Sequence, residues 1–258
     1  MNLFLQPVLV KGQQAQETEV YVIAHRGGVV DENHAENSRA AILSAIERGY
    51  WMIEVDIRET RDGRAILHHD ADFRRFYNDP RRVEEVNWDE IQELSSEIDG
   101  ERPILFSEAA ALAAGRIRLM LDVKGNDLSE RFYREIEKAL IDNRLLETTF
   151  ILSSAQAKEY FHDRTSHSIG FNGLLEAEDA GEDVSSRYHL FMLASQLTEE
   201  MVQKAGELNV VVVAAVNEFR YVQAGEDTWE GAKRDVNRLL GLGVRYYQID
   251  SVYEPLFK

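Results

Sequence analysis

The stretch WMIEVDI, residues 51–57, has the apolar composition of a buried strand and yet contains two acids, Glu54 and Asp56. Side chains two positions apart in a strand point to the same face, so both carboxylates share a face with Met52. The alternate apolar residues form the opposite face and would pack on helices. Burying two unpaired carboxylates is strongly unfavourable, so the stretch predicts a positive partner on the acidic face.

Strand patterns alternate with helix patterns along the whole chain, and each strand-like run is followed by a helix-like one. This alternation predicts a single-domain (β/α)8 TIM barrel over residues 1–258. A doubly wound sheet is the alternative, but residues 20–60 contain no G-x-G-x-x-G turn to favour it. The eight predicted strands are 20–25, 51–57, 116–124, 148–154, 166–172, 189–195, 209–217 and 244–250. The predicted helices are 38–49, 107–115, 128–142, 155–161, 198–209 and 229–240, with another near 87–94.

The charge balance limits the possible partners. The chain has 29 Lys and Arg against 46 Asp and Glu, a formal net charge of −17. Such a field repels nucleic acids, so no nucleic-acid partner is expected, and an anionic substrate needs a local positive site. The absence of cysteine excludes a thiolate metal site and leaves oxygen ligands for a hard metal.

The N-terminal residues 1–20 contain a short apolar stretch without the basic region and small-residue cleavage site of a signal peptide. No apolar run approaches the length of a membrane span. The sequence therefore predicts a cytoplasmic protein without stable membrane insertion.

A barrel places its active site at the carboxyl ends of its strands. Polar residues stand at most of these predicted strand ends. Alternation puts Glu54 and Asp56 on one face of the strand 51–57, and it puts Asp122 and Lys124 on one face of the strand 116–124. Three acids converging on one mouth suit one divalent cation, Mg²⁺ or Ca²⁺. The polar residues at the predicted strand ends are His25, Arg26, Glu54, Asp56, Asp122, Lys124, Ser153, Ser154, Asn172, Ser195, Asn217 and Asp250.

Two histidines accompany the predicted metal site. His25 ends the first strand, and His69 follows the second within HHD. An imidazole titrates near neutral pH and therefore suits proton transfer in both directions. His68 alternates with His69 and is expected to point away, and we expect His162, His167 and His189 to be structural.

The motifs AHRGG (24–28), AENS (35–38), IEVDIRETRDG (53–63) and HHD (68–70), in this order, resemble the glycerophosphodiester phosphodiesterase family. The resemblance implies a (β/α)8 barrel that hydrolyses a small-molecule phosphodiester with the help of a metal. The implied substrates are glycerophosphodiesters or related phospholipid head-group diesters. It implies a catalytic acid/base pair, His25 and His69; metal ligands Glu54, Asp56 and Asp122; phosphate-binding residues Arg26 and Lys124; and supporting residues Glu36, Asn37, Asp70 and Asn217.

The chain departs from the family pattern in ways that leave the substrate open. Asp122 stands where the family usually has glutamate, and Ala214 stands where it often has tryptophan. Two alternatives therefore stay open beside hydrolysis: a phospholipase-D-like lyase that releases a cyclic phosphate, and a non-catalytic phosphate-binding barrel. Residues 73–82 are either a lid over an anionic substrate or a solvated excursion with Arg–acid pairs, and the second is favoured.

Overall fold

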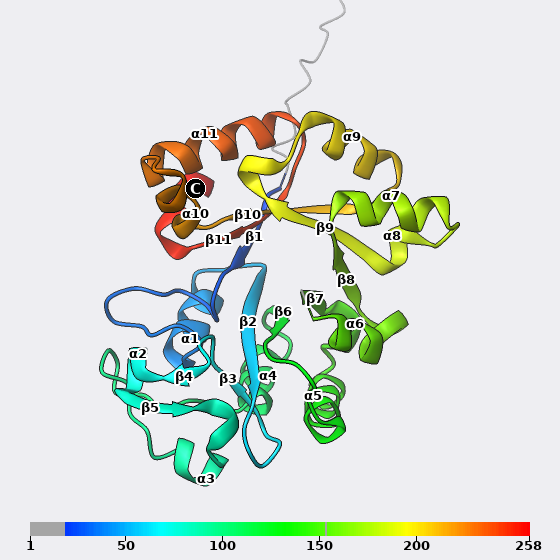
Figure 1. Ribbon diagram of the computed structural model, residues 1–258. Coiled ribbons are helices and arrows are strands. Elements are labelled where there is room, and N and C mark those ends of the chain that lie inside the picture. Colours follow the sequence, from blue (N-terminus) through cyan, green and yellow to red (C-terminus); the bar gives the residue numbers. More distant parts are fainter. Residues whose placement is uncertain (1–18, 153) are drawn as a thin grey trace, which may run out of the picture.

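The computed structural model describes residues 19–152 and 154–258. Eight parallel strands follow one another around a ring, and the first, β1, pairs with both β2 and β11, which closes the sheet into a barrel (Figure 1). The predicted (β/α)8 barrel is thus confirmed. Its strands are β1 (Tyr21–Ala24), β2 (Met52–Glu59), β6 (Arg118–Val123), β7 (Phe150–Leu152), β8 (Ser166–Ile169), β9 (Tyr188–Leu193), β10 (Val211–Val216) and β11 (Tyr246–Ile249).

Helices cover the outside of the barrel (Figure 1). Ser38 caps the first of them by accepting a hydrogen bond from the Ala41 amide, as the sequence predicts. Among the described residues, no helix is both long and apolar enough to cross a membrane. The helices of the barrel are α1 (Arg39–Glu47), α4 (Phe106–Ala113), α5 (Glu130–Asp142), α6 (Ala155–Phe161), α7 (Phe171–Asp179), α8 (Val184–Arg187), α9 (Glu199–Glu207), α10 (Glu218–Ala224) and α11 (Thr228–Gly241), with 3₁₀ turns η2 (Leu146–Thr148), η3 (His162–Arg164), η4 (Ala194–Gln196) and η5 (Ser251–Phe257).

Two details of the prediction were wrong. Helix α4 begins after Leu105 rather than at Ser107, because the Glu108 side chain reaches back to the Leu105 amide and fixes an earlier start. Asn172 is not at a strand end, since β8 stops at Ile169 and α7 begins at Phe171. Residues 1–18 of the N-terminal stretch 1–20, for which a signal peptide is not expected, lie outside the described residues, as does Ser153.

The alternation read from residues 51–57 matches the observed packing. Ile53, Val55 and Ile57 belong to the large core between strands and helices. Met52 lies inside the barrel with Met120. Glu54, Asp56 and Asp122 lie an even number of residues after these two methionines, so their side chains also point into the barrel. Their carboxylates therefore face its carboxyl-terminal mouth.

Between β2 and α4 the chain makes an excursion outside the ring of strands (Figure 1). It has a small core of its own, and its arginines form ion pairs such as Arg81 with Asp79 and Arg82 with Glu84. The ion pairs agree with the favoured interpretation of residues 73–82. The elements of the excursion are β3 (Ala65–Leu67), β4 (Asp72–Phe73), α2 (Arg74–Tyr77), β5 (Asp79–Arg82), η1 (Val83–Glu85) and α3 (Trp88–Ile91).

Candidate active site

The predicted metal ligands meet at the barrel mouth. Strands β2 and β6 run parallel with Asp56 directly opposite Asp122, and Glu54 lies one inward position earlier on β2. One carboxylate oxygen from each of the three residues lies within 4.8 Å of the others. Glu54 and Asp56 are buried, whereas Asp122 is half-buried at the rim.

Electrostatics distinguish the two acids of β2. Burial, reinforced by the charges of Asp56 and Asp122, raises the pKa of Glu54 well above its ordinary value. Burial alone would also raise the pKa of Asp56, but Lys124, His69 and the Asn37 amide bring it below its ordinary value.

Lys124 supplies the positive partner that the opening stretch requires. Its ammonium group lies 3.0 Å from Asp56 and 2.5 Å from Asp122.

These three acids fit a hard divalent cation. Carboxylate oxygens are the ligands that Mg²⁺ and Ca²⁺ prefer, and three carboxylates in one small group carry more negative charge than one lysine offsets. The raised pKa of Glu54 is the physical sign of that excess, since a dication at the cluster would favour the ionised form. The described residues therefore contain acidic groups that could hold a divalent metal.

His25 is oriented by a residue from the far end of the chain. Its Nδ1 lies 2.5 Å from a carboxylate oxygen of Asp250, and the Asn217 amide lies 3.2 Å from the same nitrogen. The second oxygen of Asp250 accepts a hydrogen bond from the Glu218 amide at 2.6 Å. Burial would raise the pKa of Asp250, but the contact with His25 keeps it below its ordinary value. An ionised Asp250 therefore favours the Nδ1–H tautomer of His25, in which Nε2 carries the lone pair.

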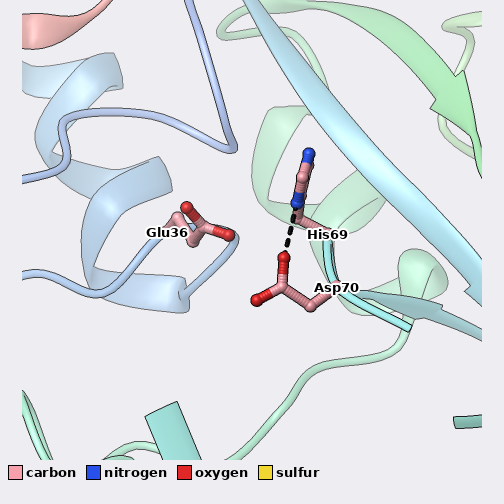
Figure 2. A group of neighbouring side chains, drawn as sticks. All are labelled: Glu36, His69 and Asp70. Atoms are coloured by element: carbon pink, nitrogen blue, oxygen red, sulfur yellow. Dashed lines mark hydrogen bonds and ion pairs between the residues drawn. The ribbon is translucent and has the colours of Figure 1, made fainter. Parts of the chain in front are cut away.

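His69, which follows β3, also has a carboxylate partner at its Nδ1 (Figure 2). Its Nδ1 donates to Asp70 at 2.7 Å, and Arg58 donates twice to the His69 carbonyl oxygen. The Arg75 guanidinium bonds Asp70 at 2.8 Å and also reaches Glu36. Asp70 thus orients the His69 ring.

Glu36, His69 and Asp70 form a second group whose donor atoms lie within 4.8 Å of one another (Figure 2). The guanidinium of Arg75 bridges the two carboxylates of this group, and Arg26 contacts Glu36 at 2.8 Å. Because arginines already supply the positive charge, this group serves as a support for His69 rather than as a metal site.

The HRGG turn brings the first strand end close to the metal ligands. The Arg26 amide donates to Glu54 at 2.8 Å, and the Gly27 amide donates to the Glu54 carbonyl oxygen at 2.6 Å. A Cβ at Gly27 would lie 2.5 Å from the Asn37 Cα, so glycine permits the close approach. Asn37 in turn donates to the Asp56 carboxylate at 2.9 Å and accepts from the Asp56 amide.

The structure therefore brings together the residues that the family resemblance implies for the site, and it gives Asp250, Arg75 and Arg58 contacts there that the sequence did not predict. In the sequence Asp250 was one polar strand end among many, and Arg75 was one of several arginines in residues 73–82. Closure of the barrel is the feature that could have identified Asp250 from the sequence. Because β11 pairs with β1, Asp250, the residue after β11, lies opposite His25. His68 points away from the site, as expected, and donates to the Asp72 carbonyl oxygen.

A barrel with acids and carboxylate-paired histidines at its carboxyl-terminal mouth has the layout of an enzyme active site. Comparison with known sequences narrows this class: the model of the Glycerophosphoryl diester phosphodiesterase family matches residues 25–223. The chain belongs to this family and is a phosphoric diester hydrolase.

Individual relatives agree with this assignment. The probable glycerophosphodiester phosphodiesterase 2 of Mycobacterium tuberculosis is 25% identical over 219 residues, which is 84% of this chain and 82% of that protein. A glycerophosphoryl diester phosphodiesterase from Parabacteroides distasonis superposes with a TM-score of 0.72 at 20% identity, over 94% of this chain and 87% of that one. A phosphodiesterase from Oleispira antarctica, solved with the product sn-glycerol-3-phosphate, has a TM-score of 0.69 at 16% identity, with 90% and 93% covered.

Proposed function

We propose that this protein hydrolyses glycerophosphodiesters, with one divalent cation, Mg²⁺ or Ca²⁺, held by Glu54, Asp56 and Asp122. The observation that carries the proposal is the convergence of these three carboxylates between two histidines that each have a carboxylate partner. When bound, the cation would stabilise negative charge on the phosphate oxygens.

In this proposal the two histidines move the protons. One imidazole takes the proton of the attacking water or hydroxyl group, and the other protonates the departing alcohol. The Nδ1 contacts with Asp250 and Asp70 support this role, because they fix both rings and leave Nε2 of each for transfer.

Lys124 and Arg26 would neutralise the phosphate. Lys124 lies against two of the metal-site acids, so its ammonium group is placed to contact an anion bound to the cation. The guanidinium of Arg26 is held by Glu36 and remains partly exposed. In a chain of net charge −17, such local cations are what an anionic substrate requires.

The substrate class is supported by the family match and by the product bound to the Oleispira antarctica protein. The test is a panel of glycerophosphodiesters assayed with Mg²⁺, Ca²⁺ or Mn²⁺ and again after chelation. We expect turnover that chelator abolishes and that one of the ions restores. Activity that survives complete removal of divalent ions would contradict the role of the carboxylate cluster.

Phosphorus NMR of the product separates hydrolysis from the lyase alternative. A phosphate monoester as the first product supports attack by water, whereas a cyclic phosphate that accumulates shows attack by a neighbouring substrate hydroxyl group. The same spectra recorded on a His25→Ala variant test the acid/base assignment, and full activity in that variant would overturn it.

A further inference from the structure

A cavity of about 290 Å³ opens beside His25 and Arg26, at the β1 side of the carboxylate cluster. Three apolar side chains, Val30, Phe219 and Val252, line it together with the polar groups of the site. They come from the turn after β1, from α10 and from η5. The hydroxyl group of Ser251 donates to the Val30 carbonyl oxygen, which ties two of these three segments together.

A cavity on the β6 side, between the segments that follow β2 and β6, is mainly polar. It has a volume of about 440 Å³ and is lined largely by polar and charged groups, including Arg58, Lys124, Asn126 and Asp127. Strand β2, which carries Glu54, lies between β1 and β6 in the barrel. A substrate phosphate at the carboxylates would therefore have an apolar wall on one side and a polar wall on the other.

The apolar wall extends onto the protein surface. Phe219 and Val252 are 41% and 51% exposed, and Val222, one turn further along α10, is 63% exposed. Apolar side chains gathered at the edge of a polar site indicate a ligand with an apolar part.

We propose that Val30, Phe219, Val222 and Val252 bind the aliphatic chain of an amphiphilic phosphodiester, such as a monoacyl glycerophosphodiester, whose phosphate lies at the carboxylate cluster. This inference rests on the proposed function and narrows its substrate class. The reaction is unchanged: water adds to phosphorus, the bond to the alcohol breaks, and the alcohol leaves with one proton.

The wall also limits which chain can bind. Glu218 is exposed and lines the same cavity, so its carboxylate disfavours an aliphatic chain with a negatively charged end. The aliphatic chain of the substrate is therefore neutral. The cavity is near the lower limit of about 300–1,000 Å³ for ligand pockets, so it holds only the first carbons of the chain. The remaining carbons would pass over Phe219 and Val222. The Arg220 guanidinium carbon lies 4.5 Å from the centre of the Phe219 ring, a cation–π contact.

The test compares two soluble substrates that differ only in the chain: glycerophosphocholine and its monohexanoyl derivative, kept below its micelle concentration. We expect kcat/KM to be at least about tenfold higher for the hexanoyl substrate, because each buried methylene contributes to binding. Phe219→Ala should lower this ratio about tenfold, and Phe219→Leu should retain most of it. Ile141→Ala is the matched control, since Ile141 is 54% exposed on α5 and outside the cavity.

Each other outcome overturns the proposal in a recognisable way. Equal kcat/KM for the two substrates, or equal ratios in Phe219→Ala and Ile141→Ala, would contradict the assigned substrate class while leaving the proposed function intact. A Phe219→Ala variant that loses only binding to phosphatidylcholine vesicles would show instead that the apolar wall docks on membranes. If neither diester is cleaved with any ion, the proposed function fails and the substrate class fails with it.

Discussion

The contact between His25 and Asp250 gives the sharpest prediction about the chemistry. In Asp250→Asn the amide oxygen can still accept from the Glu218 amide, so the side chain should keep its orientation. The amide NH₂ then faces the Nδ1 of His25, where a carboxylate oxygen stood at 2.5 Å. A donor at this position favours the opposite tautomer and removes the charge that stabilises the protonated ring.

The expected magnitude follows from the kind of bond that is lost. A hydrogen bond to a charged group contributes about 1.5–3 kcal/mol. Because this bond strengthens as His25 becomes positively charged, its loss acts on the transition state and should lower kcat roughly 10- to 150-fold. Asp250 acts through His25 and is a positioning residue, so KM should change by no more than about twofold.

The assay is steady-state release of the phosphate monoester from glycerophosphocholine, with folding checked by circular dichroism. Asp163→Asn is the matched control, because Asp163 forms an exposed ion pair with His162 at 2.9 Å. The control should retain wild-type kcat. If Asp250→Asn also retains kcat in a folded protein, or if it raises KM and leaves kcat unchanged, the reasoning about His25 is refuted.

Three further outcomes follow from the geometry. Glu54→Gln should lower Ca²⁺ or Mg²⁺ affinity by about 10- to 100-fold in titration calorimetry together with activity, and unchanged affinity would remove Glu54 from the metal site. Gly28→Ala should lower the free energy of unfolding by about 2–4 kcal/mol, because the new Cβ would lie 2.2 Å from the Ala41 carbonyl oxygen and the residue has a φ of +137°. Gly181→Ala is the control: it has open space around it and should cost only about 1 kcal/mol in thermal unfolding. Burial lowers the pKa of His189 to about 3 in the folded protein. In an unfolded chain a histidine has a pKa of about 6.5, so as the pH falls the unfolded state binds a proton before the folded state does. The free energy of unfolding should therefore decrease as the pH drops below about 6.5. Urea unfolding at about pH 7 and about pH 5 should show a loss of up to about 1.4 kcal/mol per pH unit that His189→Phe reduces; an unchanged slope would exclude His189 as the cause.

The sequence by itself determined the barrel and the acidic face of β2. Strand alternation has a period of two residues, so the phase of Met52, Glu54 and Asp56 is a local property that needs no knowledge of the fold. The same rule, applied to residues 116–124, placed Asp122 and Lys124 on the mouth. The short motifs around His25 and His69 then sufficed to identify the family.

Only the tertiary structure decided how His25 is held. Asp250 lies 225 residues after His25, and their contact depends on closure between β1 and β11 and on the register of that pairing. Arg75 contacts Glu36 only because the excursion returns to the segment between β1 and α1, which no local pattern encodes. The apolar wall beside His25 has the same origin, since Val30, Phe219 and Val252 come from three separate segments. Local periodicity fixes which face a side chain takes, whereas its partners depend on long-range packing between strands that are distant in the chain.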